Sequence, residues 1–452
     1  MSRIYLLRVA ACLLLAGLLM PAAGILQAAE QKPDDALIQM ITELVSDSDR
    51  DMRALGFQQV REEAPGPAAT KKFAEVLSKL PPEGQAGLLE ALGDRGDAAA
   101  LPAVQKSIES KSQPVRAAAL GALGALGGKQ DVPLLAKKAA AGSDAEKNAA
   151  RKSLVRMRGD GVNAAIQAAM ADAKGDVHIE LLGVLAARNA KEALPAVFKS
   201  AKDTDPAIRQ AALGALRFLA GEKDTAAVVG LLKAAPEGPE RRTAELALLT
   251  LCSRASEACS GAVIAGLDDA DPASRVVLLR ALARSGGAKA LETIAARLKD
   301  DNEAARDQAV RMLAGWPDAA AVPHLRRLAK GDNLRHQVLA IRGLVRLAGP
   351  QGDKPADAKI LAELMGLAKR PDEKRLVLGA LGGVATADSL KLATSSLDDA
   401  ALVEEAGLAA VMIAEKMKDA DKAALRTAME KVGKKVKNQE VCKRAQKVLK
   451  SL

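Results

Sequence analysis

The stretch Ile208–Leu219, with the sequence IRQAALGALRFL, decides the fold of this chain. Its apolar residues recur every three or four positions, which places them along one face of an amphipathic helix. The face consists mainly of Ala and Leu, a composition that suits helices packed closely against one another. The predicted stripe comprises Ile208, Ala211, Ala212, Leu216 and Leu219, with Leu213 beside it.

Segments of the same kind recur along the chain at a nearly constant spacing. The four steps from Gly84 to Ile208 are 31 residues each, and such a period indicates repeated supersecondary units. A degenerate thirteenth copy occupies residues 438–449. The twelve predicted starts of these helices are Met52, Gly84, Val115, Glu146, Val177, Ile208, Arg241, Ser274, Ala305, Leu334, Glu373 and Val403.

A second apolar segment of helical period lies between successive copies of this helix. Several of these segments carry a proline near their start, which a first helical turn tolerates. Each repeat is therefore predicted to be two helices joined by a short turn, giving an all-α chain of about 13 antiparallel helix pairs. Examples of the first helix are Ala98–Ser107, Asp131–Ala140, Lys191–Ser200, Lys289–Leu298 and Asp318–Ala329.

The turn before the second helix is often acidic, as in residues 203–206 and 268–272. Calcium binding is one interpretation, but no EF-type loop with a terminal bidentate Glu follows. We expect N-caps instead, because Asp or Asn before Pro accepts backbone N–H bonds and places negative charge at the helix N-terminus. An Arg recurs early in the second helix, for example Arg116 and Arg209. Arg and Asp of neighbouring repeats are predicted to form a structural ladder.

The pattern Asp-x-Asp-Pro-x-Ile-Arg-x-Ala-Ala-Leu-x-Ala-Leu at Asp203–Leu216, preceded by Ala193-Leu194-Pro195, resembles HEAT repeats of the short, phycobilisome-lyase-like type. The resemblance extends from about Asp34 to Ala414. It implies an α-solenoid, a superhelical stack of helix pairs whose extended concave surface is a scaffold for other macromolecules. Elementary packing agrees, since one pair cannot bury its apolar stripe without neighbours.

Enzymes built from similar repeats offer a third candidate function. Deoxyhypusine hydroxylase holds iron with His-Glu dipeptides, but the residues after the three histidines here are Ile179, Leu325 and Gln337. Phycobilin lyases share the repeat, yet an exported chain lacking Tyr after its leader offers little support for a bilin. The sequence has no phosphate loop, nucleophile elbow or zinc motif. No catalytic residue, metal or cofactor is predicted.

The N-terminus has the pattern of a secretory signal peptide. Arg3 and Arg8 precede the apolar run Val9–Met20, and small residues end near Ala28 or Ala29. An uncleaved anchor is the alternative, although the run is short for a membrane span of ~20 residues. We expect residues 1–29 to be removed and residues 30–452 to form a single exported solenoid, located in the periplasm or outside the cell.

Three cysteines follow the leader. Cys252 and Cys259 would flank a short turn, and two interpretations remain open for them: a disulfide in an oxidising compartment, or two small buried side chains.

Positive charge is concentrated at the C-terminus. Residues 415–452 hold 12 Lys and Arg against 5 Asp and Glu, and residues 420–452 are predicted to cap the stack. A solvated cap and attachment to an anionic envelope surface both fit this charge. Nucleic acid fits poorly, because no aromatic residues alternate with the basic ones. The candidate contacts to an anionic surface are Lys434, Lys435, Lys437, Lys443, Arg444 and Lys447.

We therefore expect an exported, non-catalytic scaffold that binds an unidentified protein, with envelope attachment as the alternative. Trp316, His324 and Arg326 are the candidate partner-binding cluster. For Trp316, filling the turn before Pro317 is the competing interpretation.

The longest step between repeats comes from residues 348–356, whose Gly and Pro predict an enlarged loop. This loop is either a binding element or a neutral insertion.

Overall fold

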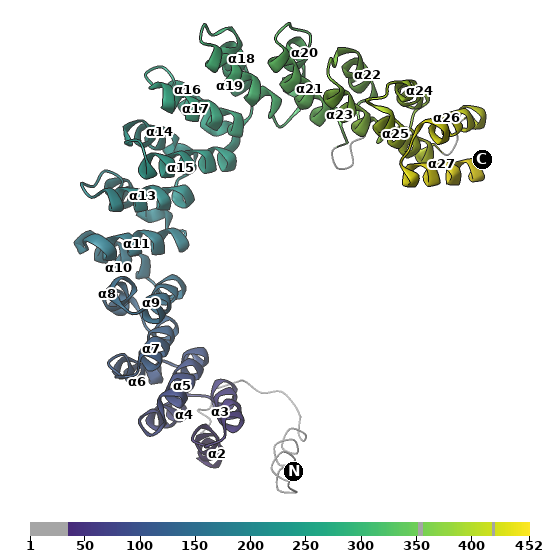
Figure 1. Cartoon of the computed structure of the whole chain (residues 1–452). Coiled ribbons are helices and arrows are strands. Elements are labelled where there is room, and N and C mark those ends of the chain that lie inside the picture. Colours follow the sequence, from purple (N-terminus) through teal and green to yellow (C-terminus); the bar gives the residue numbers. More distant parts are fainter. Residues whose placement is uncertain (1–34, 351–355, 418–420) are drawn as a thin grey trace, which may run out of the picture. The chain divides into compact units, whose positions relative to one another are not determined.

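The computed structural model describes residues 35–350, 356–417 and 421–452 (Figure 1). Within these residues every regular element is an α-helix or a short 3₁₀-helix, and the helices stack in chain order as an α-solenoid. The predicted fold class is confirmed. The predicted leader, residues 1–29, lies outside the described part of the chain. In the part described, none of the helices combines the length and the apolar character that crossing a membrane requires.

Taken two at a time, α2 to α27 make thirteen helix pairs in the described residues. The first helices are α2 (Asp35–Val45), α4 (Pro67–Glu75), α6 (Leu101–Ser107), α8 (Val132–Ala141), α10 (Val162–Asp172), α12 (Leu194–Ser200), α14 (Thr225–Ala234), α16 (Ser260–Ala265), α18 (Ala288–Ala296), α20 (Val322–Ala329), α22 (Ala358–Leu367), α24 (Ala387–Ser395) and α26 (Lys422–Lys435).

The second helices are α3 (Arg50–Glu62), α5 (Pro82–Arg95), α7 (Gln113–Leu126), α9 (Asp144–Arg156), α11 (Gly175–Ala187), α13 (Pro206–Leu219), α15 (Pro239–Ala255), α17 (Pro272–Ser285), α19 (Glu303–Ala314), α21 (Leu334–Ala348), α23 (Pro371–Leu381), α25 (Val403–Lys416) and α27 (Gln439–Ser451). All twelve predicted starts fall within the first three residues of these helices, because the first helical turn begins at or just before each apolar phrase.

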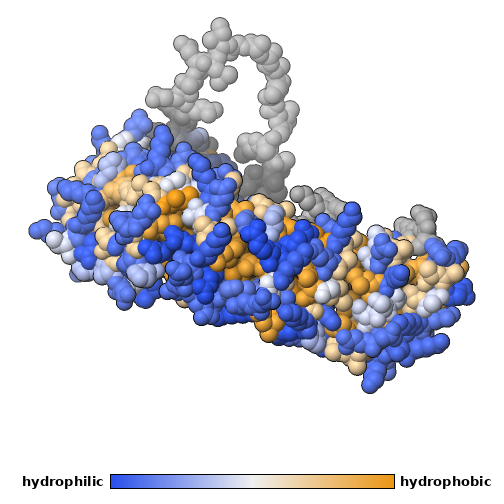
Figure 2. Space-filling model, turned by 90° about the horizontal axis from the view of Figure 1, so that it is seen from above, coloured by the Kyte–Doolittle hydropathy of each residue, from blue (hydrophilic) through white to orange (hydrophobic). Residues whose placement is uncertain are grey.

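The described residues fall into two compact units, one of residues 35–127 with 143–153 and one of residues 128–142 with the described residues from 154 onward. Within the second unit, the first helices from α14 to α24 lie along one side of the stack and the second helices from α15 to α25 along the other (Figure 1). The surface seen in Figure 2 mixes the two polarities, since hydrophobic residues lie between hydrophilic ones.

Burial in each pair depends on the neighbouring pairs. Helix α13 contacts α11, α12 and α15, and it buries Ile208, Ala212, Leu213, Leu216 and Leu219. The predicted stripe is therefore confirmed apart from one residue, since Ala211 is only half-buried. Such nearest-neighbour burial gives a long series of small cores instead of one central core.

The enlarged loop after α21 is described only at its two ends. The Asp357 N–H donates a hydrogen bond to the Ala348 carbonyl at 2.7 Å, so the two ends lie close together. Residues 351–355, which hold most of the predicted insertion, lie outside the described residues.

Candidate interaction surface

The acidic turns cap the second helices, as the sequence predicts. Asp49, Asp205, Asp271 and Asn302 each accept hydrogen bonds from backbone N–H groups of the first helical turn. These side chains therefore serve the helix termini. In the described residues no three His, Cys, Asp or Glu side chains gather in a way that could hold a metal ion.

At Arg116 and Arg209 the recurring Arg of the second helix forms the predicted ladder. The Nη1 of Arg209 donates to the carbonyls of Asp203 and Thr204 at 2.9 and 3.0 Å, and its other nitrogens donate to both oxygens of Glu240 at 2.9 Å. Arg116 makes the equivalent bonds to its own turn and to Glu146. At these two positions the acid is a Glu of the next second helix, whereas Arg241 pairs with an Asp, Asp271, as the sequence had suggested.

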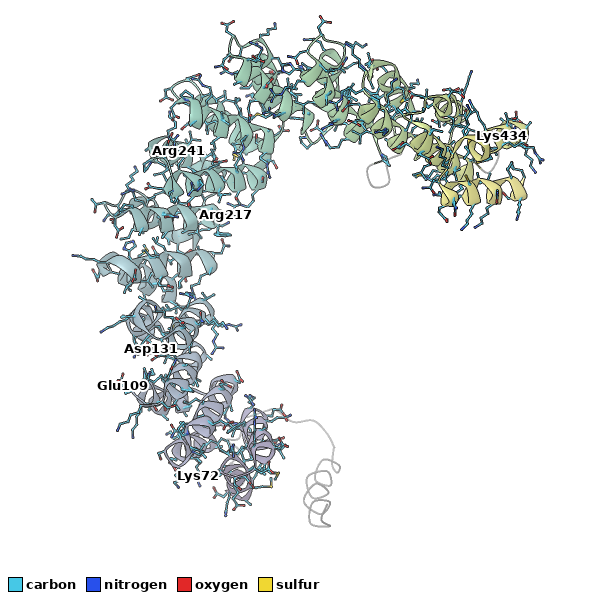
Figure 3. The ribbon with its side chains drawn as sticks, viewed as in Figure 1. Lys72, Glu109, Asp131, Arg217, Arg241 and Lys434 are labelled. Carbon is cyan, nitrogen blue, oxygen red and sulfur yellow. The ribbon has the colours of Figure 1, made fainter. Side chains whose placement is uncertain are left out.

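Glu146 is nearly buried, and its hydrogen bonds from Arg116 and Ser143 lower the pKa of this carboxyl from 4.5 to about 2. In the second unit, Arg241 pairs with Asp271 at 3.3 Å and continues the pattern (Figure 3). These charged residues are engaged within the stack, so their function is structural.

A second set of four arginines, which the sequence did not reveal, connects four of the repeats to the ones before them. Arg188 reaches back from the end of α11 and donates to the carbonyls of Leu154, Val155 and Met157 at 2.7, 2.9 and 2.8 Å. The last carbonyls of a helix have no partner within that helix, and a guanidinium satisfies several of them. The same contact is made by Arg95, Arg254 and Arg346.

The predicted partner-binding cluster does not form one surface. The Trp316 side chain is 1% exposed, and its carbonyl accepts a hydrogen bond from Arg346. That prediction is corrected: Trp316 fills the turn after α19 and leaves no surface for a partner. Arg326 of α20 bonds Glu363 of α22 at 2.8 Å, and His324 lies half-buried on the same first helix.

The other two histidines also bond within the stack. His336 Nε2 lies 2.6 Å from Asp307 Oδ1, and His178 Nε2 lies 2.8 Å from the Ser200 hydroxyl.

Cys252 and Cys259 are both fully buried free thiols. Burial raises the pKa of the Cys252 thiol, and a hydrogen bond joins it to Cys259. The two side chains therefore lie together and are buried, which is compatible with both interpretations of the sequence. The disulfide stays a prediction.

The basic residues of the last pair divide into two groups. Lys435 bonds Asp398 at 3.3 Å, and Arg444 bonds Glu415 at 2.6 Å, so both charges are partly neutralised. Lys434 (Figure 3), Lys437 and Lys443 are exposed, and in the described residues their side chains form no ion pair. Lys447 is exposed too and contributes to the lowered pKa of Glu415. The anionic-surface contact stays a prediction for this set.

Large exposed apolar side chains mark the second helices. Of the eight such residues in the described part of the chain, only Met40 lies on a first helix. Phe218 of α13 is the most exposed, at 56%. We call this side of each unit the second-helix face. Its exposed apolar residues are Leu55, Phe218, Leu246, Val276, Leu334, Leu376 and Leu408.

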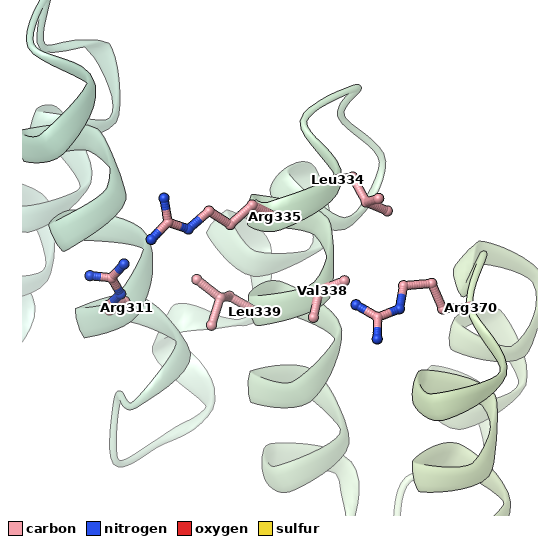
Figure 4. Close-up of a pocket in the computed structure, with 6 residues that line it drawn as sticks. All are labelled: Arg311, Leu334, Arg335, Val338, Leu339 and Arg370. Atoms are coloured by element: carbon pink, nitrogen blue, oxygen red, sulfur yellow. The ribbon is translucent and has the colours of Figure 1, made fainter.

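Two open hollows adjoin α21 on the second-helix face of the second unit. The first, of about 480 Å³, is lined by Arg311, Leu334, Arg335, Val338, Leu339 and Arg370 (Figure 4). The second, of about 580 Å³, is lined by Arg342, Val345, Arg346, Asp372, Arg375 and Leu376. We call the two hollows together the α21 surface. Its lining holds six arginines and a single carboxylate.

Comparison with known proteins identifies the repeat. A family model described as HEAT repeats matches residues 70–155, 162–249 and 260–344, more than half of the chain. The model does not distinguish the phycobilisome-lyase-like subtype that the sequence suggested. A search of curated protein sequences finds no match.

The fold is similar to that of the karyopherin Kap121p. The crystal structure of Kap121p bound to the extreme C-terminus of the protein phosphatase Cdc14p has a TM-score of 0.52 at 13% identity, covering 91% of this chain and 53% of Kap121p. Kap121p bound to Pho4p gives a TM-score of 0.51 at 13% identity, with coverages of 92% and 53%. The chain thus spans about half the length of Kap121p, and the likeness concerns the fold alone.

Proposed function

The chain belongs to the HEAT-repeat family, and from this premise we propose that it is an exported, non-catalytic scaffold that binds another protein along its second-helix face. Stacked HEAT repeats are a kind of solenoid that typically mediates protein–protein interaction. The observation that carries the proposal is the distribution of exposed apolar side chains, nearly all of which lie on second helices. Exposed apolar groups gathered on one face favour association with a partner.

Individual residues are expected to contribute unequally to binding. Phe218 is large and exposed, and the Arg217 guanidinium lies 5.5 Å from the centroid of its ring. Aromatic and Arg side chains dominate many protein interfaces, so this pair is a candidate anchor. Leu246, on the next second helix, is also about half exposed.

The test compares recovery of a partner by three forms of the affinity-tagged full chain, cross-linked in cells that produce it. The double variant Phe218→Ser and Leu246→Ser should lose the partner recovered by the unaltered chain. Met40→Ser changes an exposed apolar residue of a first helix and is the matched control. Equal recovery by the double variant and the unaltered chain, with equal thermal unfolding midpoints, would contradict the proposal.

Export is supported by the signal-like residues before position 30 and has its own test. We expect the chain in the periplasmic or extracellular fraction, with a new N-terminus near Ala29 or Glu30. A cytosolic chain that begins at its first residues would exclude export. That result would not contradict the proposal that a partner binds the second-helix face.

Envelope attachment through the last helix pair is the second candidate. The observation that favours it is a group of exposed lysines that pair with no acid among the described residues, Lys434, Lys437 and Lys443. Each basic residue near an anionic membrane adds roughly 1 kcal/mol. Binding to vesicles containing phosphatidylglycerol should fall when these three become Gln. Retention of full binding in low salt would exclude them as the anchor.

A further inference from the structure

The α21 surface combines arginines and aliphatic side chains in an order that a repeat scaffold does not require. Leu334, Val338, Arg342 and Val345 follow one another at steps of four, four and three residues, and so lie along one stripe of α21. Figure 4 shows Val338 and Leu339 between the guanidinium groups of neighbouring helices, with Arg311 on one side and Arg370 on the other. Apolar contact area and fixed positive charge therefore alternate over a length of about 18 Å.

Buried carboxylates hold these arginines in place. Asp307 is 9% exposed and pairs with Arg335 at 2.5 Å and with Arg311 at 3.9 Å. Glu373 is 1% exposed and pairs with Arg342 at 3.1 Å and with Arg370 at 3.5 Å. These two acids lie beneath the surface while the arginines they orient remain at it, and Arg370 also bonds the exposed Asp372 at 2.8 Å.

The exposed arginines outnumber the acids available to them. The side chains of Arg335 and Arg342 are 60% and 50% exposed, and those of Arg311 and Arg370 nearly as much. A guanidinium has five N–H donors, so one bond to a buried acid leaves others directed to solvent. Arg binds carboxylates with two parallel N–H···O bonds, and a pre-oriented Arg loses less conformational freedom on binding.

We infer that the α21 surface binds an acidic, amphipathic segment of a partner protein, with carboxylates on the arginines and aliphatic side chains against Leu334, Val338 and Leu339. This inference rests on the proposed function, because it gives the chemistry of the partner at one part of the second-helix face. Charge complementarity selects the acidic segment. The lining has no aromatic side chain on which a nucleic-acid base could stack.

The probe is a fluorescein-labelled peptide of about twelve residues, built from Glu and Leu at helical spacing so that its length matches the stripe on α21. Two control peptides replace Glu by Gln or Leu by Ser. Fluorescence anisotropy against the full chain, over a series of salt concentrations, gives Kd. We expect binding of the Glu–Leu peptide that weakens with salt, and binding at least about tenfold weaker for each control peptide.

Variants then locate the site. Arg335→Gln and Arg370→Gln each leave the buried acid a second cationic partner, so the fold should persist, and each should weaken binding about tenfold. Leu334→Ser should do likewise, since this side chain is half exposed. Arg158→Gln alters an exposed Arg elsewhere in the second unit and should leave Kd unchanged. Thermal unfolding midpoints confirm folding of each variant.

Three outcomes would overturn the inference: equal affinity for the Glu and Gln peptides, variants that bind like the unaltered chain, or tighter binding of single-stranded RNA or anionic vesicles lost in the same variants. The proposed function is tested separately. If the acidic peptide does not bind while Phe218→Ser with Leu246→Ser still abolishes partner recovery, only this inference is wrong. If neither test succeeds, both proposals fail.

Discussion

Gly124 and Gly121 lie one turn apart on α7, and they differ in how much free space surrounds them. A Cβ added at Gly124 would lie 2.6 Å from the Cα of Ser153, whereas one added at Gly121 would have no atom within 4 Å. The Ser153 hydroxyl donates to the Leu120 carbonyl at 2.7 Å, which holds the two helices at this close approach. The glycine at 124 is thus required by packing, and the one at 121 is not.

This contrast yields a matched pair of substitutions. Gly124→Ala should lower the free energy of unfolding by about 1–3 kcal/mol, because the new methyl group overpacks the contact with Ser153. Gly121→Ala should raise it by roughly 0.5–1 kcal/mol, because Ala loses less backbone entropy in a helix. Urea unfolding followed by circular dichroism measures both. Destabilisation of equal size at the two positions would show that α7 does not approach Ser153.

Glu146 should make stability depend on acid pH. Its folded pKa of about 2 lies below its ordinary 4.5, so the stabilisation is complete above pH 4.5 and is lost as pH falls toward 2. Glu146→Gln should cost about 2 kcal/mol near neutral pH, because the bonds to Arg116 and Ser143 lose their charge. The difference between the two proteins should disappear near pH 2.

The control for this titration is Glu83→Gln. Glu83 is largely exposed, and its nearest cation, Arg50, lies 3.9 Å away. Exposed ion pairs contribute at most about 1 kcal/mol, so this substitution should change stability little at any pH. A Glu146→Gln protein that matched the unaltered chain from neutral to acid pH would contradict the assignment.

At the scale of the element, four second helices end against an Arg from the following repeat. Arg188 donates to three carbonyls of residues 31–34 positions earlier, and its Nε also donates to the Asn163 side chain at 2.5 Å. The guanidinium therefore holds the end of one helix pair against the next. Burial lowers the pKa of Arg188 from its ordinary value, and a guanidinium remains charged well above neutral pH.

Replacement of this side chain should be costly. Arg188→Met should destabilise the chain by about 3 kcal/mol, because it leaves carbonyls at the end of α9 without partners. Arg188→Lys should recover only part of the loss, since a single ammonium cannot match the fork geometry. Arg158→Met changes an exposed Arg nearby and should alter stability by less than about 0.5 kcal/mol. Thermal unfolding of the three variants makes the comparison, and equal effects at 188 and 158 would refute it.

The helices themselves could be predicted from the sequence, but these arginine contacts between repeats could not. The apolar period is a local signal and located the second helices to within three residues. Arg188 stands near a helix C-terminus, where a cation complements the helix dipole and needs no further explanation. Its carbonyl partners belong to another repeat, and no local pattern identifies them. The ladder was easier to predict, because its Arg recurs at the same place in many repeats.

At the scale of the whole molecule, the main contacts of α26 and α27 outside their own pair are with α24, α25 and the intervening 3₁₀-helix η9 (Ser396–Asp398). Removal of residues 421–452 should therefore reduce hydrogen-exchange protection in α24 and α25 while leaving α11 to α19 protected. Hydrogen exchange read by mass spectrometry resolves these regions. Loss of protection in α11 to α19 would show that the second unit unfolds as one cooperative body.

The candidate site was harder to predict than the fold. Trp316 drew attention as the single Trp, but rarity carries no information about exposure, and the side chain is buried. The α21 surface draws on three second helices and the turn before α23, so its six arginines meet only after the stack has formed. Arg335, Leu339 and Arg342 on one helix face were visible in the sequence, yet Arg311 and Arg370 reach them only across helices.

The arginine contacts between repeats run from a later repeat to an earlier one, and the ribosome synthesises the earlier repeat first. Arg95, Arg188, Arg254 and Arg346 each reach back to the preceding repeat. When one of these repeats leaves the ribosome, the carbonyls at the end of its second helix therefore have no arginine partner until the next repeat has emerged. We expect the most recently synthesised of these repeats to pack loosely at the end of its second helix. The repeats made earlier should already hold their arginine contacts. Ribosome-bound chains stopped just before and just after Arg188 should differ in protease sensitivity at the end of α9.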